Sequence, residues 1–285
     1  MRLCRFQNSQ GHVRVGLTYD GTTLLDLAVA GVERLDTLLE SENPQAAITR
    51  LTSQTQTRYS VRSVKLLTPI ERQEVWAAGV TYLRSKAARM EESQSSANAY
   101  DAVYEASRPE LFFKSLPEKV VGPGGEVGIR KDAFWNVPEP ALALVANSKG
   151  RIVGYTIGND MSSRDIEGEN LLYLPQAKVY DRSCAVGPWI IVGSTENEVR
   201  SWTVHIRIQR ANKVIFQGET SISQIKRAFT ELIGYLYRSQ SFPNGAVLLT
   251  GTGIVPPGDF SLQVADNIQI NISGIGSLEN TVKLV

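Results

Sequence analysis

The chain has few residues of the types that most often carry redox or nucleophilic chemistry. Its 285 residues include 2 cysteines and 2 histidines. Cys4 and Cys184 lie far apart and form neither a metal-binding nor a disulfide pattern, and this scarcity is typical of a reducing compartment. His12 and His205 stand apart from every cluster of candidate site residues. A Ser-His-Asp or Cys-His nucleophilic site therefore has no support.

Strong net charge and long apolar runs are absent as well. The formal net charge is +1, with 42% hydrophobic and 21% charged residues. This balance gives no reason to expect a nucleic acid or an anionic membrane as partner. No apolar run approaches the length of a membrane span, and the first residues lack the apolar core of a signal peptide. We therefore expect a cytoplasmic protein.

The length allows one large domain, or a large domain with a small one. The first part, residues 1–65, has the pattern of a small N-terminal domain with short strands and two short helices. Strands are expected at 3–6, 13–17 and 23–25, and helices near 32–40 and 46–51. The polar segment 53–60 is expected to be a linker.

The remainder of the chain is expected to be mostly β with a few helices, an α+β class. Strands are predicted at 75–80, 109–114, 141–146, 152–157, 186–192, 204–209, 247–250, 261–264 and 267–272. The strongest helix pattern runs from 221 to 240, where apolar residues recur at helical spacing. Strands and helices do not alternate, which argues against a doubly wound parallel sheet.

The stretch that organises the chain runs from residue 136 to residue 180. Two apolar segments within it, separated by turn residues, predict a hairpin. Glu139 and Asp160 stand at the ends of this hairpin, and a long polar loop rich in charge is expected at 159–169. Dense charge beside apolar strands favours a metal or anion site at the mouth of a sheet. The alternative, that both carboxylates are exposed strand-end charges, stays open.

Lys178 and Glu110 are candidates for moving protons. Lys178 lies among apolar residues, and a lysine in a dry site has a lowered pKa that suits proton transfer. The other interpretation is a surface lysine with a buried stem. Glu110 stands beside two phenylalanines, which would raise the pKa of its carboxyl group, or it is an ordinary edge-strand charge.

Two further positions favour an anionic ligand. The segment 250–253, Thr-Gly-Thr-Gly, places a hydroxyl and backbone N–H groups at a strand end, which suits a carboxylate or a phosphate. The same residues are also common in ordinary turns. Arg84 offers a guanidinium group that could pair with an anionic substrate.

Several motifs together resemble the fumarylacetoacetate hydrolase superfamily. The segment GYTIGNDMSSRD at 154–165 is similar to its central signature. The branch of 2-keto-3-deoxy-D-arabinonate and -xylonate dehydratases is the most similar, through AGVTYLRSKAARMEES (78–93), RPELFFK (108–114), WNVPEPALALV (135–145) and IEGENLLYLPQAKVYD (166–181). The resemblance covers residues 72–285 and implies a β-roll catalytic domain there. It also implies dependence on Mg²⁺, with Mn²⁺ or Ca²⁺ as alternatives, and a homodimer or homotetramer.

The resemblance implies a metal site with one departure. Glu139 and Asp160 match the first and last carboxylates of the family's three-carboxylate site. The family pattern continues as Glu-x-Glu, and the position of the second Glu holds Ala141. A methyl group cannot coordinate a cation, so we expect weaker metal binding, although Mg²⁺ commonly keeps several waters and two carboxylates can hold it. A weakened site, a lost activity and an alanine introduced to trap a ligand all stay open.

The resemblance also implies roles in catalysis and substrate binding. Glu110 and Lys178 match the acid/base pair of the dehydratases, without an assignment of which is acid and which is base. Thr252 matches the threonine that helps hold the substrate carboxylate. Arg84 and Ser85 lie in the loop that contacts substrate, and Ser85 stands where hydrolases of the superfamily carry a histidine.

These implications predict a metal-dependent hydro-lyase whose partner is a small 2-keto acid. The expected reaction removes water from a 2-keto-3-deoxy pentonate by enolate formation and loss of the 4-hydroxyl, giving 2,5-dioxopentanoate, with activity reduced if Ala141 weakens the metal site. Three rivals stay open: a catalytically silent keto-acid-binding member, an acylpyruvate hydrolase, and an oxaloacetate decarboxylase or tautomerase. The hydrolase is disfavoured because Ser85 replaces the expected histidine.

Overall fold

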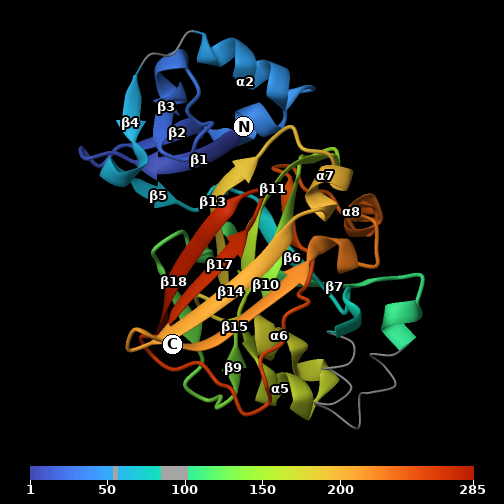
Figure 1. The fold of residues 1–285 in the computed structure, drawn as a ribbon. Coiled ribbons are helices and arrows are strands. Elements are labelled where there is room, and N and C mark those ends of the chain that lie inside the picture. The colour runs from blue at the N-terminus through green and yellow to red at the C-terminus, as the bar shows by residue number, and fades with distance from the viewer. Residues whose placement is uncertain (54–56, 85–101) are drawn as a thin grey trace.

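The computed structural model describes residues 1–53, 57–84 and 102–285, and most of its regular structure is β. Figure 1 shows a smaller N-terminal part lying against one end of a larger body of long strands. The strands of the largest sheet are β1 (Arg2–Gln7), β2 (Val13–Thr18), β3 (Thr23–Asp26), β4 (Arg58–Ser60), β5 (Lys65–Leu67), β6 (Glu74–Gly79), β7 (Glu110–Ser115), β10 (Pro140–Ala146), β11 (Ile152–Asp160), β13 (Cys184–Ile191) and β16 (Ala246–Leu249).

Two further sheets and short helices complete the described structure. A five-stranded sheet contains β8 (Glu126–Ile129), β14 (Thr203–Arg210), β15 (Lys213–Ser221), β17 (Asn267–Ile272) and β18 (Gly276–Leu284), and β9 (Asn136–Val137) pairs with β12 (Ser162–Ser163). The α-helices include α1 (Leu35–Leu39), α2 (Pro44–Thr52), α5 (Arg164–Glu169), α6 (Leu174–Lys178), α7 (Glu196–Arg200) and α8 (Phe229–Tyr237), and residues 102–105 are helical as well. Single 3₁₀ turns are η1 (Leu27–Ala30), η2 (Val61–Ser63), η3 (Pro117–Lys119), η4 (Leu171–Tyr173) and η5 (Ile222–Gln224).

The largest sheet runs without interruption from the N-terminal part into the main body. Its strand order is β4-β3-β2-β1-β13-β11-β10-β16-β6-β7, and β5 also pairs with β1. The connection between the two parts is the antiparallel contact of β1 with β13, where Arg2 faces Ile191 and Leu3 faces Ile190. The proposed division into residues 1–65 and 72–285 therefore stays a prediction, because one sheet crosses it.

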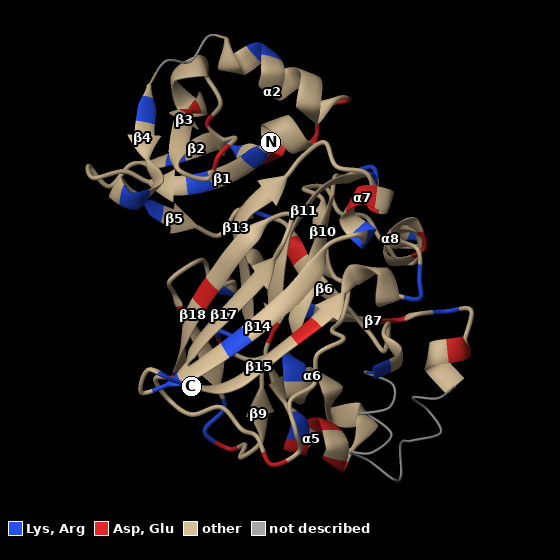
Figure 2. Cartoon of the chain, viewed as in Figure 1, with Lys and Arg blue, Asp and Glu red and all other residues tan. Residues whose placement is uncertain are grey.

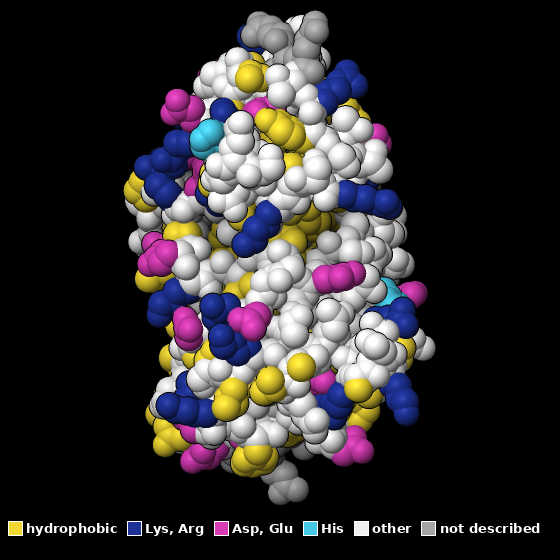
Figure 3. All heavy atoms as spheres, turned by 90° about the vertical axis from the view of Figure 1, so that its left-hand side faces the viewer, with side chains coloured by type: hydrophobic (Ala, Val, Ile, Leu, Met, Phe, Trp, Pro, Cys, Tyr) yellow, Lys and Arg dark blue, Asp and Glu magenta, His cyan; other side chains and the backbone are white. Residues whose placement is uncertain are grey.

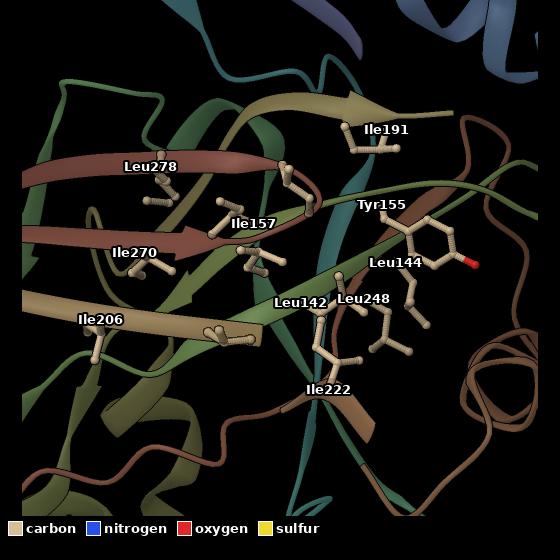
Figure 4. Packing of buried hydrophobic residues seen from close by; sticks show 14 of the residues in the cluster. Leu142, Leu144, Tyr155, Ile157, Ile191, Ile206, Ile222, Leu248, Ile270 and Leu278 are labelled. Carbon is tan, nitrogen blue, oxygen red and sulfur yellow. The ribbon is translucent and has the colours of Figure 1, made fainter. Parts of the chain in front are cut away.

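Strand β10 is buried on both faces and forms the centre of the molecule. All seven of its residues are buried. Leu142 and Leu144 point into the apolar cluster between the two large sheets, where Ile206, Ile270 and Leu278 meet them (Figure 4). Ala143 and Val145 point the other way, into a cluster that continues into the N-terminal part. Alternate side chains of a strand point to opposite faces, so this strand serves both cores.

The predicted hairpin is confirmed as β10 and β11. The two strands pair antiparallel, and Pro140 faces Asn159 at their open end. This register brings Glu139, just before β10, beside Asp160, the last residue of β11. The hairpin therefore carries both acidic residues to one end of the molecule, next to α5 and α6 (Figure 1).

Four predictions of local structure were wrong. The segment 53–60 is not only a linker, because residues 58–60 form β4, which pairs with β3. The segment 159–169 is not a long loop, because α5 occupies its second half, and acids at a helix N-terminus such as Asp165 and Glu167 suit the helix dipole. The helix predicted over 221–240 is shorter. Strand β15 extends to Ser221, Ile225 has an extended backbone, and only α8 is α-helical. The predicted strand 261–264 is an irregular connection.

The surface shows no strong segregation of charge on the face that Figure 3 displays, where basic and acidic side chains are interspersed. This agrees with a formal net charge of +1. Among the helices in the described part of the chain, none combines the length and the apolar character needed to cross a membrane.

Helix α8 offers a test of local stability. Gly234 is exposed within it, and an added Cβ would meet nothing within 4 Å. Because alanine favours the helix and restricts the unfolded chain, we expect Gly234→Ala to raise the free energy of unfolding by about 0.5–1 kcal/mol. Urea denaturation measures it. Gly158→Ala is the opposite control, since its Cβ would lie 2.3 Å from Leu249 Cδ2 and should destabilise. A destabilising Gly234→Ala would contradict the packing described for α8.

Candidate active site

Two carboxylates meet at the open end of the β10–β11 hairpin. The backbone N–H of Asp160 donates to the carbonyl of Glu139 at 3.0 Å, which fixes the two residues side by side. Both side chains are buried, with exposed fractions of 6% for Glu139 and 5% for Asp160. The hydroxyl of Ser162 donates to Glu139 Oε1 at 3.0 Å. The interpretation of these acids as exposed strand-end charges is wrong.

One ammonium group lies between these carboxylates. Lys178 ends helix α6 and is 1% exposed, so it is not a surface lysine. Its Nζ lies 2.9 Å from Glu139 Oε1 and 3.4 Å from Asp160 Oδ2. The ring of Phe112 on β7 lies 5.7 Å from the same nitrogen. The two carboxylates therefore converge on one point that already holds a cation.

Two more cations pair with these carboxylates. Arg164, at the start of α5, places Nη2 2.9 Å from Glu139 Oε1. Lys114, at the end of β7, places Nζ 2.5 Å from Asp160 Oδ1. Complete burial lowers the pKa of Lys114, and the charge of Asp160 opposes this shift. Buried charges are costly unless paired, and here two carboxylates are shared among three cations. Figure 2 shows charged positions gathered on α5 and α6 at this end of the sheet.

Glu110 reaches the same cleft because the neighbouring strand has no side chain opposite it. Glu110 begins β7 and pairs with Gly79, the last residue of β6. A Cβ at Gly79 would lie 2.0 Å from Glu110 Oε2, so only glycine leaves room for this carboxylate. The next residue, Val80, has φ +50°, an uncommon conformation for a β-branched residue. Such strained residues cluster at functional sites, and Val80 forms part of the cleft wall.

Thr252 lies on the opposite wall, in the segment after β16. It is 4% exposed, and its hydroxyl accepts from the N–H of Ile254 at 3.2 Å. Gly251 before it has φ +82°, and a Cβ there would lie 2.5 Å from Thr81 Oγ1. The Thr81 hydroxyl donates to the carbonyl of Thr250 at 2.6 Å and joins this segment to the end of β6.

These residues line one cleft. Its lining consists of Ala78, Gly79, Val80, Glu110, Phe112, Glu139, Asp160, Arg164, Glu167, Lys178, Gly251 and Thr252. Of the residues expected from the sequence, the cleft brings together Glu110, Lys178, Thr252, Glu139 and Asp160. Arg84 is exposed and does not line the cleft, and Ser85 lies outside the described residues. No histidine occurs in the described lining.

Ala141 is buried beside this cleft, on the same face of the strand as Glu139. It is 1% exposed, faces Gly158 across the hairpin, and belongs to the apolar cluster that contains Leu249. Within the described residues, no group of three or more His, Cys, Asp or Glu side chains is arranged to hold a metal ion. Glu139 and Asp160 offer carboxylate oxygens that already face a common positive charge, the ammonium of Lys178. This pair fits Mg²⁺, which typically binds through one or two carboxylates together with water and substrate oxygens.

The comparison with known proteins identifies the family. The profile described as "Fumarylacetoacetate (FAA) hydrolase C-terminal" matches residues 74–283, most of the chain. The chain belongs to the fumarylacetoacetate hydrolase family. The resemblance of the motifs to this family is thereby confirmed.

Two relatives within the family have similar sequences. A "Probable 2-keto-3-deoxyxylonate dehydratase" from Haloferax volcanii is 48% identical over 217 residues, which covers 76% of this chain and 74% of that protein. A "2-dehydro-3-deoxy-D-arabinonate dehydratase" from Saccharolobus solfataricus is 40% identical over 228 residues, 79% of this chain and 76% of that protein. The predicted similarity to the sugar-acid dehydratase branch is confirmed.

Solved structures of fumarylacetoacetate hydrolase family members agree with the fold. A hexagonal crystal form of 2-keto-3-deoxyarabinonate dehydratase has a TM-score of 0.83 and 34% identity, covering 100% of this chain and 99% of that chain. A 2-keto-3-deoxy-D-arabinonate dehydratase complexed with magnesium and 2,5-dioxopentanoate has a TM-score of 0.79 and 33% identity, with the same coverage. The expected mostly β fold of this family is confirmed.

Sequence reasoning missed the residues that hold the carboxylates in place. Lys114 lies in the motif at 108–114 and Arg164 in the charged segment at 159–169, and neither pattern indicates that they pair with Asp160 and Glu139. The strand period of two offered one signal, because Glu110, Phe112 and Lys114 share a face of β7. The roles of Gly79 and Ser162 depend on register between strands and had no comparable signal.

The position of Glu110 can be tested through Gly79. We expect Gly79→Ala to displace the Glu110 carboxylate and to lower kcat/KM by roughly 100-fold, since a misplacement of about 1 Å costs that much. Steady-state kinetics measures it on the substrate proposed below. Gly234→Ala is the matched control, because the same methyl group is added at a position with open space. An unchanged kcat/KM in Gly79→Ala would show that the Glu110 carboxylate does not depend on the space that Gly79 leaves.

Proposed function

We propose that this chain is a hydro-lyase that removes water from a 2-keto-3-deoxy pentonate and forms 2,5-dioxopentanoate. The observation that carries the proposal is the meeting of Glu110, Lys178, Glu139 and Asp160 in one cleft. The similarity to dehydratases of this substrate class, at 48% and 40% identity, supports the same reaction. So does the solved structure of a 2-keto-3-deoxy-D-arabinonate dehydratase, 33% identical, complexed with magnesium and 2,5-dioxopentanoate.

The reaction needs two groups that move protons. Loss of the C3 proton and the 4-hydroxyl gives an enone between C3 and C4. A proton must then leave C5 while a proton is added at C3, which gives an enol between C4 and C5. This enol becomes the aldehyde when C4 takes up a proton and the hydroxyl group on C5 loses one. Glu110 and Lys178 supply an acid/base pair for these transfers, which is the usual role of such side chains in a site of this kind.

Glu139 and Asp160 would hold the divalent cation, proposed to be Mg²⁺ with Mn²⁺ or Ca²⁺ as alternatives. When bound, such an ion polarises a keto oxygen and stabilises negative charge on it. Arg164 and Thr252 line the cleft, and we propose that they bind the substrate carboxylate by charge and by hydrogen bonding. Burial of the surrounding charges keeps water out and strengthens these interactions.

Other features of the proposal concern the whole protein. We infer that it acts in the cytoplasm as a homodimer or homotetramer, with residues 72–285 as the catalytic domain and 1–65 as a small N-terminal domain. We also infer that Arg84 and Ser85 contact the substrate. Static light scattering of the purified protein tests the oligomeric state, and a monomer at micromolar concentration would contradict it.

Ala141 predicts a particular dependence on metal. We expect turnover of 2-keto-3-deoxy-D-arabinonate at millimolar Mg²⁺, and we expect Ala141→Glu to lower the Mg²⁺ concentration for half-maximal rate on the order of tenfold, because an anionic ligand is added. Product formation against Mg²⁺ concentration measures both. Glu139→Gln should shift the curve in the opposite direction.

The possible outcomes separate the competing interpretations. Activity in Ala141→Glu alone would identify the present chain as a silent binder of keto acids. Activity in neither protein would reject the pentonate and favour oxaloacetate. Identical Mg²⁺ curves would show that residue 141 is not a ligand position.

Proton exchange can assign the acid and the base. In D₂O, we expect Glu110→Gln and Lys178→Met each to lower kcat by roughly 10²- to 10⁴-fold. The variant that lacks the base should also lose exchange of the substrate C3 protons, which NMR detects, whereas the variant that lacks the acid should keep it. If either variant keeps kcat within threefold of the unmodified protein, that residue does not belong to the pair.

A further inference from the structure

Lys114 is a fully buried lysine next to the cleft. The proposed reaction assigns it no role. Lys114 is 0% exposed. On β7 it lies at an irregularity of pairing with β6, since Ser115 faces Val75 and Phe113 faces Trp76, which leaves Lys114 without an opposite residue. Such bulges redirect side chains beside active sites. The Lys114 ammonium ends beside the cleft, at Asp160 Oδ1.

The ammonium of Lys114 lies against three oxygen atoms. It donates hydrogen bonds to the carbonyl oxygens of Met161, at 2.9 Å, and of Lys178, at 2.5 Å. It also forms an ion pair with Asp160 Oδ1, at 2.5 Å. The ring of Tyr180 lies 5.9 Å from the same nitrogen and closes the site on another side.

These contacts tie together the two elements that carry the reacting cluster. Asp160 is the last residue of β11 and Met161 follows it directly, whereas Lys178 is the last residue of α6. Asp160 uses Oδ1 for Lys114 and turns Oδ2 toward Lys178 Nζ. Lys114 thus sets the rotation of the Asp160 carboxylate and also holds the backbone from which the Lys178 side chain extends.

We propose that Lys114 is the positioning residue of this active site, which fixes Asp160 and Lys178 relative to each other from below without touching the substrate. The inference rests on the proposed function for its kinetic part and on contacts alone for its structural part. A lysine that served only to stabilise the fold would not need to join the two residues on which the chemistry depends.

The test compares Lys114→Met with Arg72→Met. The control also removes one cationic partner of a buried carboxylate, because Arg72 Nη2 lies 2.7 Å from Asp36 Oδ2 in the N-terminal part. For Lys114→Met we expect kcat to fall about 100-fold while KM stays within threefold, since misplacement by about 1 Å has that effect on rate. Hydrogen–deuterium exchange should accelerate in the peptides covering 158–164 and 172–181. Arg72→Met should change neither kcat nor the exchange rates of these peptides.

The outcomes decide the two proposals separately. If the unmodified protein does not turn over the pentonate, the proposed function fails, and the exchange data still decide whether Lys114 holds the two segments. Unchanged exchange in Lys114→Met, or accelerated exchange with an unchanged kcat, overturns the positioning role. If Lys114→Met does not fold, Lys114→Gln removes the positive charge that pairs with Asp160 and shortens the side chain that reaches the two carbonyl groups. A folded Gln variant with the kcat of the unmodified protein would likewise overturn it.

Discussion

The burial of two carboxylates at the end of one hairpin is the constraint on which the rest of the site depends. Glu139 and Asp160 are almost entirely removed from water, and charges in such surroundings persist only when they are paired. Their partners come from three different elements: Lys114 from β7, Arg164 from α5 and Lys178 from α6. Pairing of the two buried carboxylates thus brings β7, α5 and α6 to the same end of the hairpin. The ion pairs that hold these elements together are also the contacts that shape the candidate active site.

Much of this arrangement follows from short-range signals in the sequence. The β10–β11 hairpin was predictable because two apolar runs flank a turn. The position of Glu139 and Asp160 at its open end followed from the hairpin, and their identity as a candidate metal pair followed from the charge around them. The motif resemblance then led to Glu110, Lys178 and Thr252, which the cleft brings together.

What the sequence could not provide depends on contacts between distant segments. The role of Gly79 exists only because β7 lies beside β6, and no local pattern distinguishes it from a glycine in a turn. Lys114 looks like the polar end of a strand until its partners on β11 and α6 are known. The helix predicted over 221–240 had the right apolar spacing, but the extension of β15 to Ser221 and the extended backbone at Ile225 shortened it. Tertiary context decided each case.

The passage of one sheet through both parts of the molecule has a consequence for engineering. Strand β1 covers part of the edge of β13, and β13 is the direct neighbour of β11, which ends at Asp160. A chain shortened to its family-matching portion would uncover backbone N–H and C=O groups on that edge, one strand away from the catalytic hairpin. Uncovered edges recruit strands from other molecules. The N-terminal strands therefore cover part of the edge of β13 in the largest sheet. A shortened chain would need another segment to cover that edge if it is to avoid association with other molecules.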